Sequence, residues 1–202
     1  QQARFALGNS YNIPAVRVLA LNGVENFVDF AKTIGITTWS DPSNYGLSLT
    51  LGGGEVMPYD MTVAFGVFAN EGVKVPLISI LKVTDWKGKV LDEVTIENVE
   101  GDRVLTPDVT FLISHILHDN NARSSAFGES SFLNVRGHPE VSVKTGTTND
   151  LRDNWTIGYT AHALVVTWVG NNDNTPMGAS VSGVSGASPI WNRMIREVLD
   201  TA

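Results

Sequence analysis

Apolar residues in the first part of the chain recur at helical spacing. The segment VENFVDFAKTIGI places its apolar residues on one helical face, and Gly35 follows as a C-cap. Shorter helices are predicted over 14–21, where Pro14 suits a first turn, and over 60–70, which stops at Gly72. The N-terminal part is therefore expected to be mainly helical.

From about residue 78, the spacing of apolar residues changes from the helical repeat to the alternation typical of strands. LISILKVTD and KVLDEVTI flank Trp86-Lys87-Gly88 and predict a β-hairpin near 78–97. Thr106 and Pro107 form an N-cap and first-turn pair for a helix that runs to about His118. The polar, glycine-containing stretch 119–137 is predicted to be a long loop.

Three strands are predicted next, over 141–146, 154–160 and 163–170. The connection at 159–162 is short, so the last two strands should pair as an antiparallel hairpin, and Ser188-Pro189 opens a final helix to 199. The fold class is α+β, with an antiparallel sheet flanked by helices. We expect one domain over 1–202, mainly helical over 1–137 apart from the hairpin, with sheet strands and a C-terminal helix over 138–202.

Composition narrows the class of protein. The chain has 202 residues, of which 43% are apolar and 17% charged, as in globular proteins with a full core. There is no membrane-spanning apolar run and no secretory signal, and the start QQARFALGNS resembles the start of a fragment. The net charge of −7 argues against nucleic-acid binding.

Metal and thiol chemistry are not expected. The chain has no cysteine, which excludes disulfides and thiolate ligands. The four histidines, His115, His118, His138 and His162, form no HExxH pattern, so we expect neither a metal site nor a cofactor.

The stretch VSVKTGTTND suggests a binding site. Lys144 ends a run of β-branched residues and precedes Thr145, Gly146 and Thr147. In a strand, Lys144 points to one side and the two threonines to the other, and Gly146 leaves room for another backbone. A cation with hydroxyl groups suits a carboxylate, and an edge strand can hold an extended peptide. The alternative is a solvent-facing lysine before a glycine turn.

A second polar group is Ser10-Tyr11-Asn12, between two helical segments. By itself this group reads as helix capping, with Asn12 as the cap before Pro14. Ser-x-Asn together with Lys-Thr-Gly, however, is a pair of motifs typical of penicillin-binding proteins and serine β-lactamases.

The resemblance extends along nearly the whole chain. NSYNIPAVRVL, LTLGGGEVMPYDMTVAFGVFANEG, ISILKVTDWKGKVL, VKTGTTNDLRDNWTIGYT and VTWVGNNDNTPM occur in the order found in class A penicillin-binding proteins. The chain therefore resembles the C-terminal part of their transpeptidase domain. The resemblance implies cross-linking of peptidoglycan stem peptides through a serine ester, inhibition by β-lactam antibiotics, and a location on the extracytoplasmic face of the membrane, anchored by a segment outside this sequence.

The resemblance also implies a role for each motif residue. Ser10 would relay a proton toward the leaving nitrogen, and Asn12 would hold the substrate amide. Lys144 would keep the potential positive and support Ser10. Thr145 and Thr147 would bind the substrate carboxylate, with the Thr147 N–H in the oxyanion hole, while Gly146 would admit the substrate strand.

The family's nucleophile motif, Ser-x-x-Lys, is the missing element. Its formal match, Ser79 to Lys82, follows Ser-x-Asn instead of preceding it and lies in a predicted strand, where residues three apart point to opposite faces. We therefore assign no nucleophile to this chain. An upstream segment is expected to carry the motif, so the chain alone should be inactive and should expose apolar surface.

Other functions remain open at this point. The chain could be a non-catalytic module that senses or scaffolds peptidoglycan or binds β-lactams, and an upstream Ser-x-x-Lys would separate that reading from the enzyme. A serine β-lactamase is disfavoured, because neither Glu129 nor Glu140 has the setting of a deacylating glutamate. Glycines 52–54 read as a tight turn or as a loop that approaches the substrate.

Overall fold

The computed structural model describes residues 2–95, 99–178 and 185–201. The helices are α1 (Ala3–Gly8), α2 (Asn12–Asn22), α3 (Val24–Ile34), α4 (Pro58–Ala69), α5 (Pro107–Leu117), α6 (Asn120–Phe127) and α7 (Ala187–Thr201). Short 3-10 turns are η1 (Pro42–Asn44), η2 (Leu47–Leu51) and η4 (Asn149–Leu151). The strands are β1 (Val73–Lys74), β2 (Lys82–Thr84), β3 (Val90–Glu93), β4 (Asp102–Arg103), β5 (Ser142–Thr147), β6 (Asp153–Tyr159) and β7 (Leu164–Gly170).

The central sheet has the strand order β5-β6-β7 and is antiparallel throughout. Lys144 pairs with Ile157, and the β6–β7 hairpin closes through the bond from Thr160 N to Ala163 O at 2.8 Å. The three predicted strands and their antiparallel pairing are therefore confirmed. Among the strands that the structure describes, β5 pairs with β6 alone, so its other edge carries no neighbouring strand.

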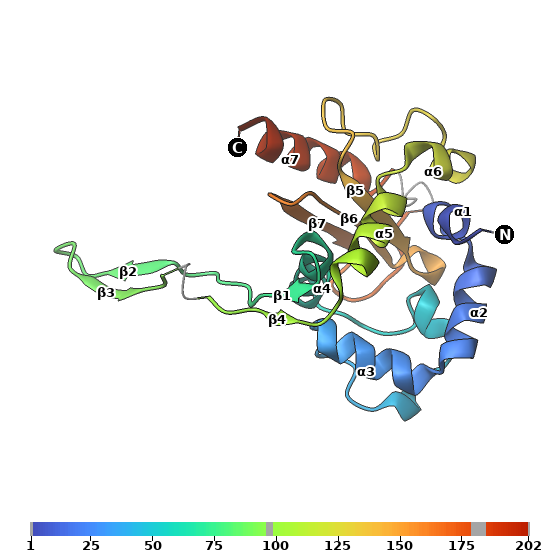
Figure 1. Cartoon of the computed structure of the whole chain (residues 1–202), viewed down its shortest axis with the longest axis horizontal. Helices are drawn as coiled ribbons and strands as arrows, with labels where there is room; N and C mark the ends of the chain where they lie inside the picture. The colour runs from blue at the N-terminus through green and yellow to red at the C-terminus, as the bar shows by residue number, and fades with distance from the viewer. Residues whose placement is uncertain (1, 96–98, 179–184, 202) are drawn as a thin grey trace.

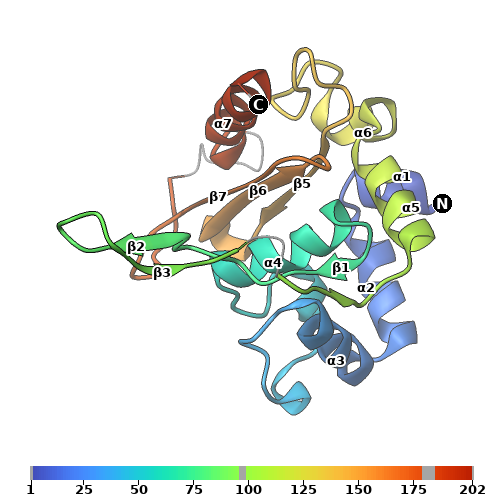
Figure 2. The same cartoon turned by 60° about the vertical axis from the view of Figure 1, so that its left-hand side comes forward.

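Helices cover both faces of this sheet (Figures 1 and 2). On one face, α7 packs against β6 and β7, and its buried Trp191 and Ile195 share a core with Val143. On the other face lie α4 and α5. The side chains of β5 alternate between these faces: Val143 joins the α7 core, whereas Ser142 donates a hydrogen bond to Ser114 O of α5 at 2.9 Å.

The helical part has a second core. Buried side chains from α2, α3, α4 and the loops between them form it: Leu19, Val28, Ala31, Ile36, Trp39, Leu49 and Ala64. The helix over Val24–Ile34 ends at Gly35, whose φ of 115° is left-handed, as predicted. The α+β class, with helices flanking an antiparallel sheet, is therefore confirmed.

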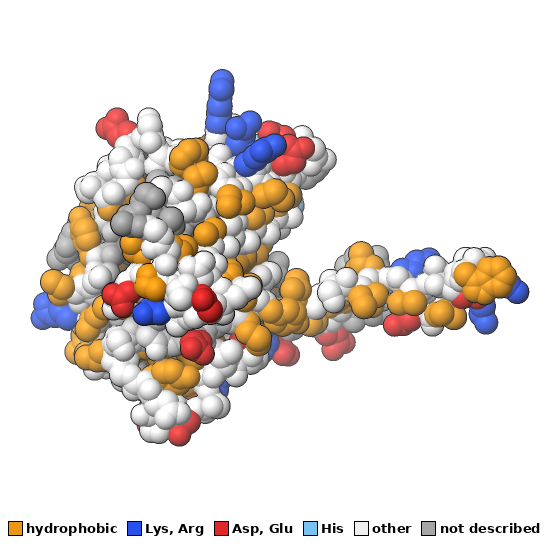
Figure 3. Space-filling view, turned by 180° about the vertical axis from the view of Figure 1, so that it is seen from behind, with side chains coloured by type: hydrophobic (Ala, Val, Ile, Leu, Met, Phe, Trp, Pro, Cys, Tyr) orange, Lys and Arg blue, Asp and Glu red, His pale blue; other side chains and the backbone are white. Residues whose placement is uncertain are grey.

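The predicted hairpin forms a projecting arm. β2 and β3 pair antiparallel, and the arm stands away from the body in Figures 1 and 3, with hydrophobic side chains along it. Lys82 forms a salt bridge with Glu93 across the arm at 2.9 Å. Positions 96 and 97 of the predicted hairpin lie outside the described residues.

Two local predictions were wrong. Part of the predicted loop 119–137 is helix α6, which Asp119 caps by accepting a bond from Ala122 N at 2.9 Å. Its sequence NNARSSAF is short and polar, so no apolar period marks it. Asn12 is not the cap of α2 either: Tyr11 is the N-cap residue, and Asn12 is the first helical residue.

Candidate active site

Strand β5 carries Lys144 on an open sheet edge. Val143 O accepts a bond from Arg123 of α6 at 3.2 Å rather than from a strand. Since alternate residues of a strand direct their backbone groups to the same edge, the groups of Thr145 and Thr147 share this outer edge. The next residue along the chain, Thr148, faces the opposite way: its N–H points toward β6 and donates to Asp153 O at 3.1 Å. The edge can therefore receive an extended peptide.

Ser10 lies in the connection between α1 and α2 and has a φ of 56°. This left-handed conformation is uncommon for a residue other than glycine. The preceding Asn9 holds it in place, because the Asn9 amide donates to Phe5 O at 2.9 Å and to Ala122 O at 2.6 Å and its Oδ1 accepts from Ala126 N at 2.8 Å. Asn9 is 5% exposed, and its bond to Ala122 O is buried, whereas the other two are partly buried.

Lys144 and Ser10 meet. The Lys144 ammonium group donates a hydrogen bond to Ser10 Oγ and another to Thr145 O, the latter at 2.6 Å. Burial and, to a smaller extent, the nearby Arg123 charge together lower the pKa of Lys144 to about 8. Near neutral pH the amine can therefore hold a proton and release it more readily than an exposed lysine.

The rest of the Lys-Thr-Gly-Thr motif lines the end of β5. Thr145 is 9% exposed, whereas Thr147 is exposed and its Oγ1 accepts a bond from Asn154 Nδ2 at 3.1 Å. Of the two threonines, Thr147 is thus the more open to a ligand. A Cβ added to Gly146 would meet only Trp155 Cβ, at 3.6 Å, so packing within the chain does not require glycine there.

Asn12 is exposed at the start of α2. Its side chain makes no hydrogen bond to any residue in the part of the chain that the structure describes. The fold brings Ser10, Lys144 and the threonine motif together, and it leaves the amide of Asn12 free for a group outside those residues.

A braced turn follows the motif. Thr148 Oγ1 accepts from Asp153 N at 2.8 Å, and Trp168 Nε1 donates to the Asp153 carboxylate at 2.9 Å. Gly52, with a φ of 92°, lies so close that an added Cβ would stand 2.8 Å from Thr148 Cγ2. The glycine-rich turn therefore packs directly beside the end of β5.

Sequence reasoning missed two residues of this region, Asn9 and Arg123. Arg123 is 4% exposed and bonds Val143 O, directly before Lys144. Neither residue has a sequence signal of its own: Asn9 looks like a capping residue, and Arg123 lies in a stretch predicted to be a loop. Their roles depend on contacts across more than 100 residues for Asn9 and 20 for Arg123.

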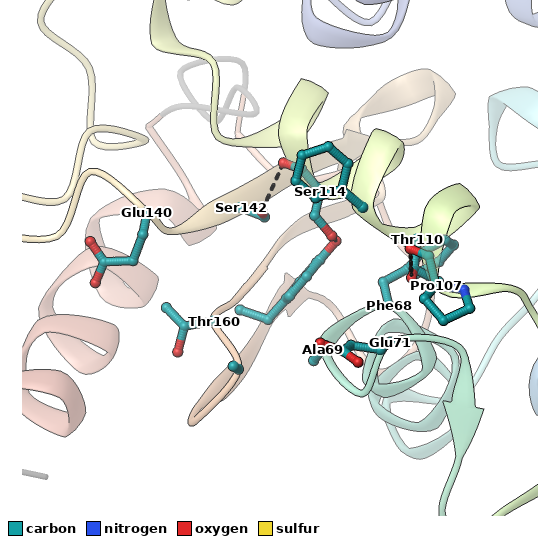
Figure 4. A pocket seen from close by; sticks show the side chains of 12 residues that line it. Phe68, Ala69, Glu71, Pro107, Thr110, Ser114, Glu140, Ser142 and Thr160 are labelled. Atoms are coloured by element: carbon teal, nitrogen blue, oxygen red, sulfur yellow. Dashed lines mark hydrogen bonds between the residues drawn. The ribbon is translucent and has the colours of Figure 1, made fainter. Parts of the chain in front are cut away.

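A cavity of about 330 Å³ lies at the opposite end of β5, between α4, α5 and the sheet (Figure 4). Ser114, Ser142 and Tyr159 are among its hydroxyl-bearing lining residues, and Phe68 and Pro107 are among its apolar ones. Ser114 Oγ and Tyr159 Oη are 2.9 Å apart, and burial raises the pKa of Tyr159. Since Ser142 shares the Lys144 face of β5, the cavity extends that face away from Ser10.

Neither a metal-binding cluster nor a membrane-spanning helix occurs in residues 2–95, 99–178 and 185–201. These residues hold no group of three or more histidine, aspartate or glutamate side chains placed to bind a metal ion. They also contain no helix of the length and hydropathy needed to cross a bilayer. The formal Ser-x-x-Lys match lies in the arm, where Lys82 begins β2 and pairs with Glu93.

The sequence resembles curated penicillin-binding proteins. Penicillin-binding protein 1A of Aquifex aeolicus is 33% identical over 189 residues, which are 93% of this chain and 24% of that protein. Penicillin-binding protein 4 of Bacillus subtilis is 31% identical over 191 residues, 92% of this chain and 28% of its own length. The chain thus spans about a quarter of these relatives. No protein-family model matches it.

Solved structures share the fold. Penicillin-binding protein 1A of Haemophilus influenzae is 26% identical, with a TM-score of 0.78 over 98% of this chain and 34% of that chain. PonA1 of Mycobacterium tuberculosis, 24% identical, has a TM-score of 0.82 over 98% of this chain and 56% of its own, which supports the fold alone. Together, these likenesses show homology to penicillin-binding proteins along nearly the whole chain, consistent with the C-terminal transpeptidase part that its motifs indicate.

Proposed function

We propose that this chain forms the substrate-binding part of a peptidoglycan D,D-transpeptidase domain, which also binds β-lactam antibiotics. The observation that carries the proposal is the hydrogen bond between Lys144 and Ser10, at the open edge of β5. It joins the two motifs for which the family is known, and it places a cation and a hydroxyl where a bound peptide would lie.

The substrate would bind as an added strand along β5. Thr147 directs its backbone to the outer edge, where its N–H can donate to the carbonyl oxygen under attack. One such donor is worth about 3–4 kcal/mol to the transition state in another serine enzyme. The Lys144 charge and the hydroxyls of Thr145 and Thr147 would hold the terminal carboxylate of the stem peptide, and Gly146 would let the peptide backbone approach.

Proton transfer would pass through Ser10. When the D-Ala–D-Ala bond breaks, the leaving nitrogen needs a proton, and Ser10 Oγ can give its own while it accepts one from Lys144. The pKa of Lys144, near 8, suits this exchange near neutral pH. Asn12, whose amide is exposed, would hold the substrate amide.

The nucleophile would come from a Ser-x-x-Lys segment outside this sequence. Ser79 is not a candidate, since it precedes strand β2 on the projecting arm. The chain alone is therefore predicted to form no acyl-enzyme. The whole protein would act on the extracytoplasmic face of the membrane, held there by an anchor that also lies outside these residues.

A second candidate is a non-catalytic module that binds peptidoglycan or β-lactams. The observation that favours it is that Thr147 is exposed on the open edge of β5 and Asn12 is exposed at the start of α2, which is what binding alone would require. The two candidates share the same binding edge, so they differ only in whether a covalent adduct forms.

Intact mass after incubation with excess benzylpenicillin tests the proposal. It would be measured for this chain alone and for the protein that includes the preceding coding sequence. An adduct that forms on the longer protein but not on this chain alone supports the enzyme. In the longer protein, Lys144→Ala should then slow formation of the adduct at least 100-fold. An adduct on the isolated chain would refute the external nucleophile, and no adduct on either would favour the binding module.

A further inference from the structure

Arg123 is a buried cation with neutral partners. Its guanidinium donates to Leu117 O at 2.9 Å and Val143 O at 3.2 Å, and two of its nitrogens donate to Asn120 Oδ1 at 2.8 and 2.5 Å. All three acceptors are uncharged. Burial lowers the pKa of Arg123 to about 10, and Asp119 opposes that effect in part. The group remains charged at neutral pH.

Arg123 joins α6 and the end of α5 to the outer edge of β5. The bond to Val143 O fixes the backbone at the residue directly before Lys144. The same helix α6 accepts a bond from the Asn9 amide at Ala122 O and donates one from Ala126 N to Asn9 Oδ1, next to Ser10. One short helix therefore positions both members of the Lys144–Ser10 pair.

The Arg123 charge also acts on Lys144. The elements in contact with β5 are β6, α5, α6 and α7. The charged or titratable side chains on these elements and at their ends are Asp108, His115, His118, Asp119, Arg123, Arg152, Asp153, Tyr159, Arg193, Arg196, Glu197 and Asp200. Arg4 is paired with Asp119 at 3.0 Å, and Asp153 is bonded by Thr148 and Trp168. Among these groups, Arg123 is the one whose charge lowers the pKa of Lys144, after burial itself.

We propose that Arg123 is a positioning residue for Lys144: it holds the outer edge of β5 at Val143, directly before Lys144, and places a buried positive charge near the amine. The effect of Arg123 on proton transfer during catalysis rests on the proposed function, whereas its effect on the position and pKa of Lys144 does not. Because Arg123 occupies the acceptor at Val143, a peptide strand added to β5 pairs from Thr145 onward. Because it repels a second cation, it favours proton transfer from Lys144 to Ser10.

The test is the titration of Lys144 by NMR of the chain labelled with ¹³C at its lysine side chains, with Lys144→Met to assign the signal. Arg123→Gln removes the charge and should move the Lys144 midpoint upward. Arg123→Lys keeps the charge and should restore the low midpoint. Arg193→Gln, on the exposed side of α7, is the matched control and should leave the midpoint unchanged.

Asn120→Asp is a second variant that preserves Arg123. The new carboxylate would occupy the place of Asn120 Oδ1, bond the same guanidinium nitrogens and neutralise the charge, so the Lys144 midpoint should again move upward. Folding of Arg123→Gln is checked by near-UV circular dichroism. If that variant does not fold, the Lys144 midpoint in Asn120→Asp alone tests the proposal. An unchanged midpoint in Asn120→Asp and in any folded Arg123→Gln would overturn the proposal, and so would an equal shift in Arg123→Lys.

The titration needs no substrate and no nucleophile. Failure of the benzylpenicillin experiment would leave its result standing, and an unchanged Lys144 midpoint would leave the transpeptidase proposal standing.

Discussion

Lys144 and Ser10 are 134 positions apart in the sequence and share a hydrogen bond in the structure. Lys144 reaches the serine from an edge strand, and Ser10 presents its hydroxyl from a strained turn between two helices. Because Asn9 and Arg123 tie both sides to α6, the pair is held by buried bonds instead of by flexible surface groups. Such preorganisation is what a proton relay requires.

The pH dependence of stability should reveal the buried Lys144. Its pKa falls from 10.5 to about 8 on folding, so between these values the unfolded chain binds more protons than the folded chain. Stability therefore rises with pH from about 8 to 10.5, by up to about 3 kcal/mol. Urea unfolding across this range should show the rise in the wild type relative to Lys144→Met. A constant difference between the two proteins would contradict the low pKa.

Gly146→Ala should separate folding from binding. The new Cβ meets only Trp155 Cβ at 3.6 Å, so the free energy of unfolding should change by less than about 1 kcal/mol. The methyl group lies on the Lys144 face, where it would obstruct an added strand, so acylation of the longer protein should fall at least tenfold.

The matched control is Gly158→Ala on the neighbouring strand. Its Cβ would lie 2.3 Å from Trp191 Cζ2 and 2.9 Å from Ser142 O, so it should cost about 2 kcal/mol or more. Equal stability losses in the two variants would show that Gly146 is needed for packing.

Asn9→Ala should destabilise the chain by about 1–3 kcal/mol, because it leaves Ala122 O without its buried partner and removes the partly buried bond from Ala126 N. It should also slow acylation of the longer protein, since Ser10 loses its anchor. Asn22→Ala is the control, because Asn22 is exposed and its amide makes only a 3.5 Å contact. Similar unfolding midpoints in urea for the two variants would argue against the anchoring role.

The isolated chain should self-associate through α2. Ile13, Val18 and Leu21 are 74%, 65% and 89% exposed on this helix, an apolar surface of the kind that marks an interface. Sedimentation velocity should show a concentration-dependent species that Leu21→Ser reduces. Trp86→Ser is the comparison, because Trp86 is 87% exposed on the arm. Loss of association in Trp86→Ser alone would assign the contact to the arm, and a wild-type monomer would refute the prediction.

Elements with a strong local period could be predicted from the sequence. The helix ending at Gly35 and the strands over Ser142–Thr147 and Leu164–Gly170 follow from the spacing of their apolar residues, which depends only on neighbours along the chain. Helix α6 has no such period. Its Asp119 cap is local, but the bonds that fix the helix in place, from Arg123 to Val143 O and from Ala126 N to Asn9, join it to distant segments.

By itself, the sequence determined the fold class, the two motifs and the family they resemble, because backbone preferences and motif residues are local properties. Only the tertiary structure decided that Ser10 and Lys144 touch, that Thr147 is more open than Thr145, and that Asn12 starts a helix instead of capping it. It also decided the pKa of Lys144, near 8, since burial and the Arg123 charge exist only once β5 is packed against its neighbours.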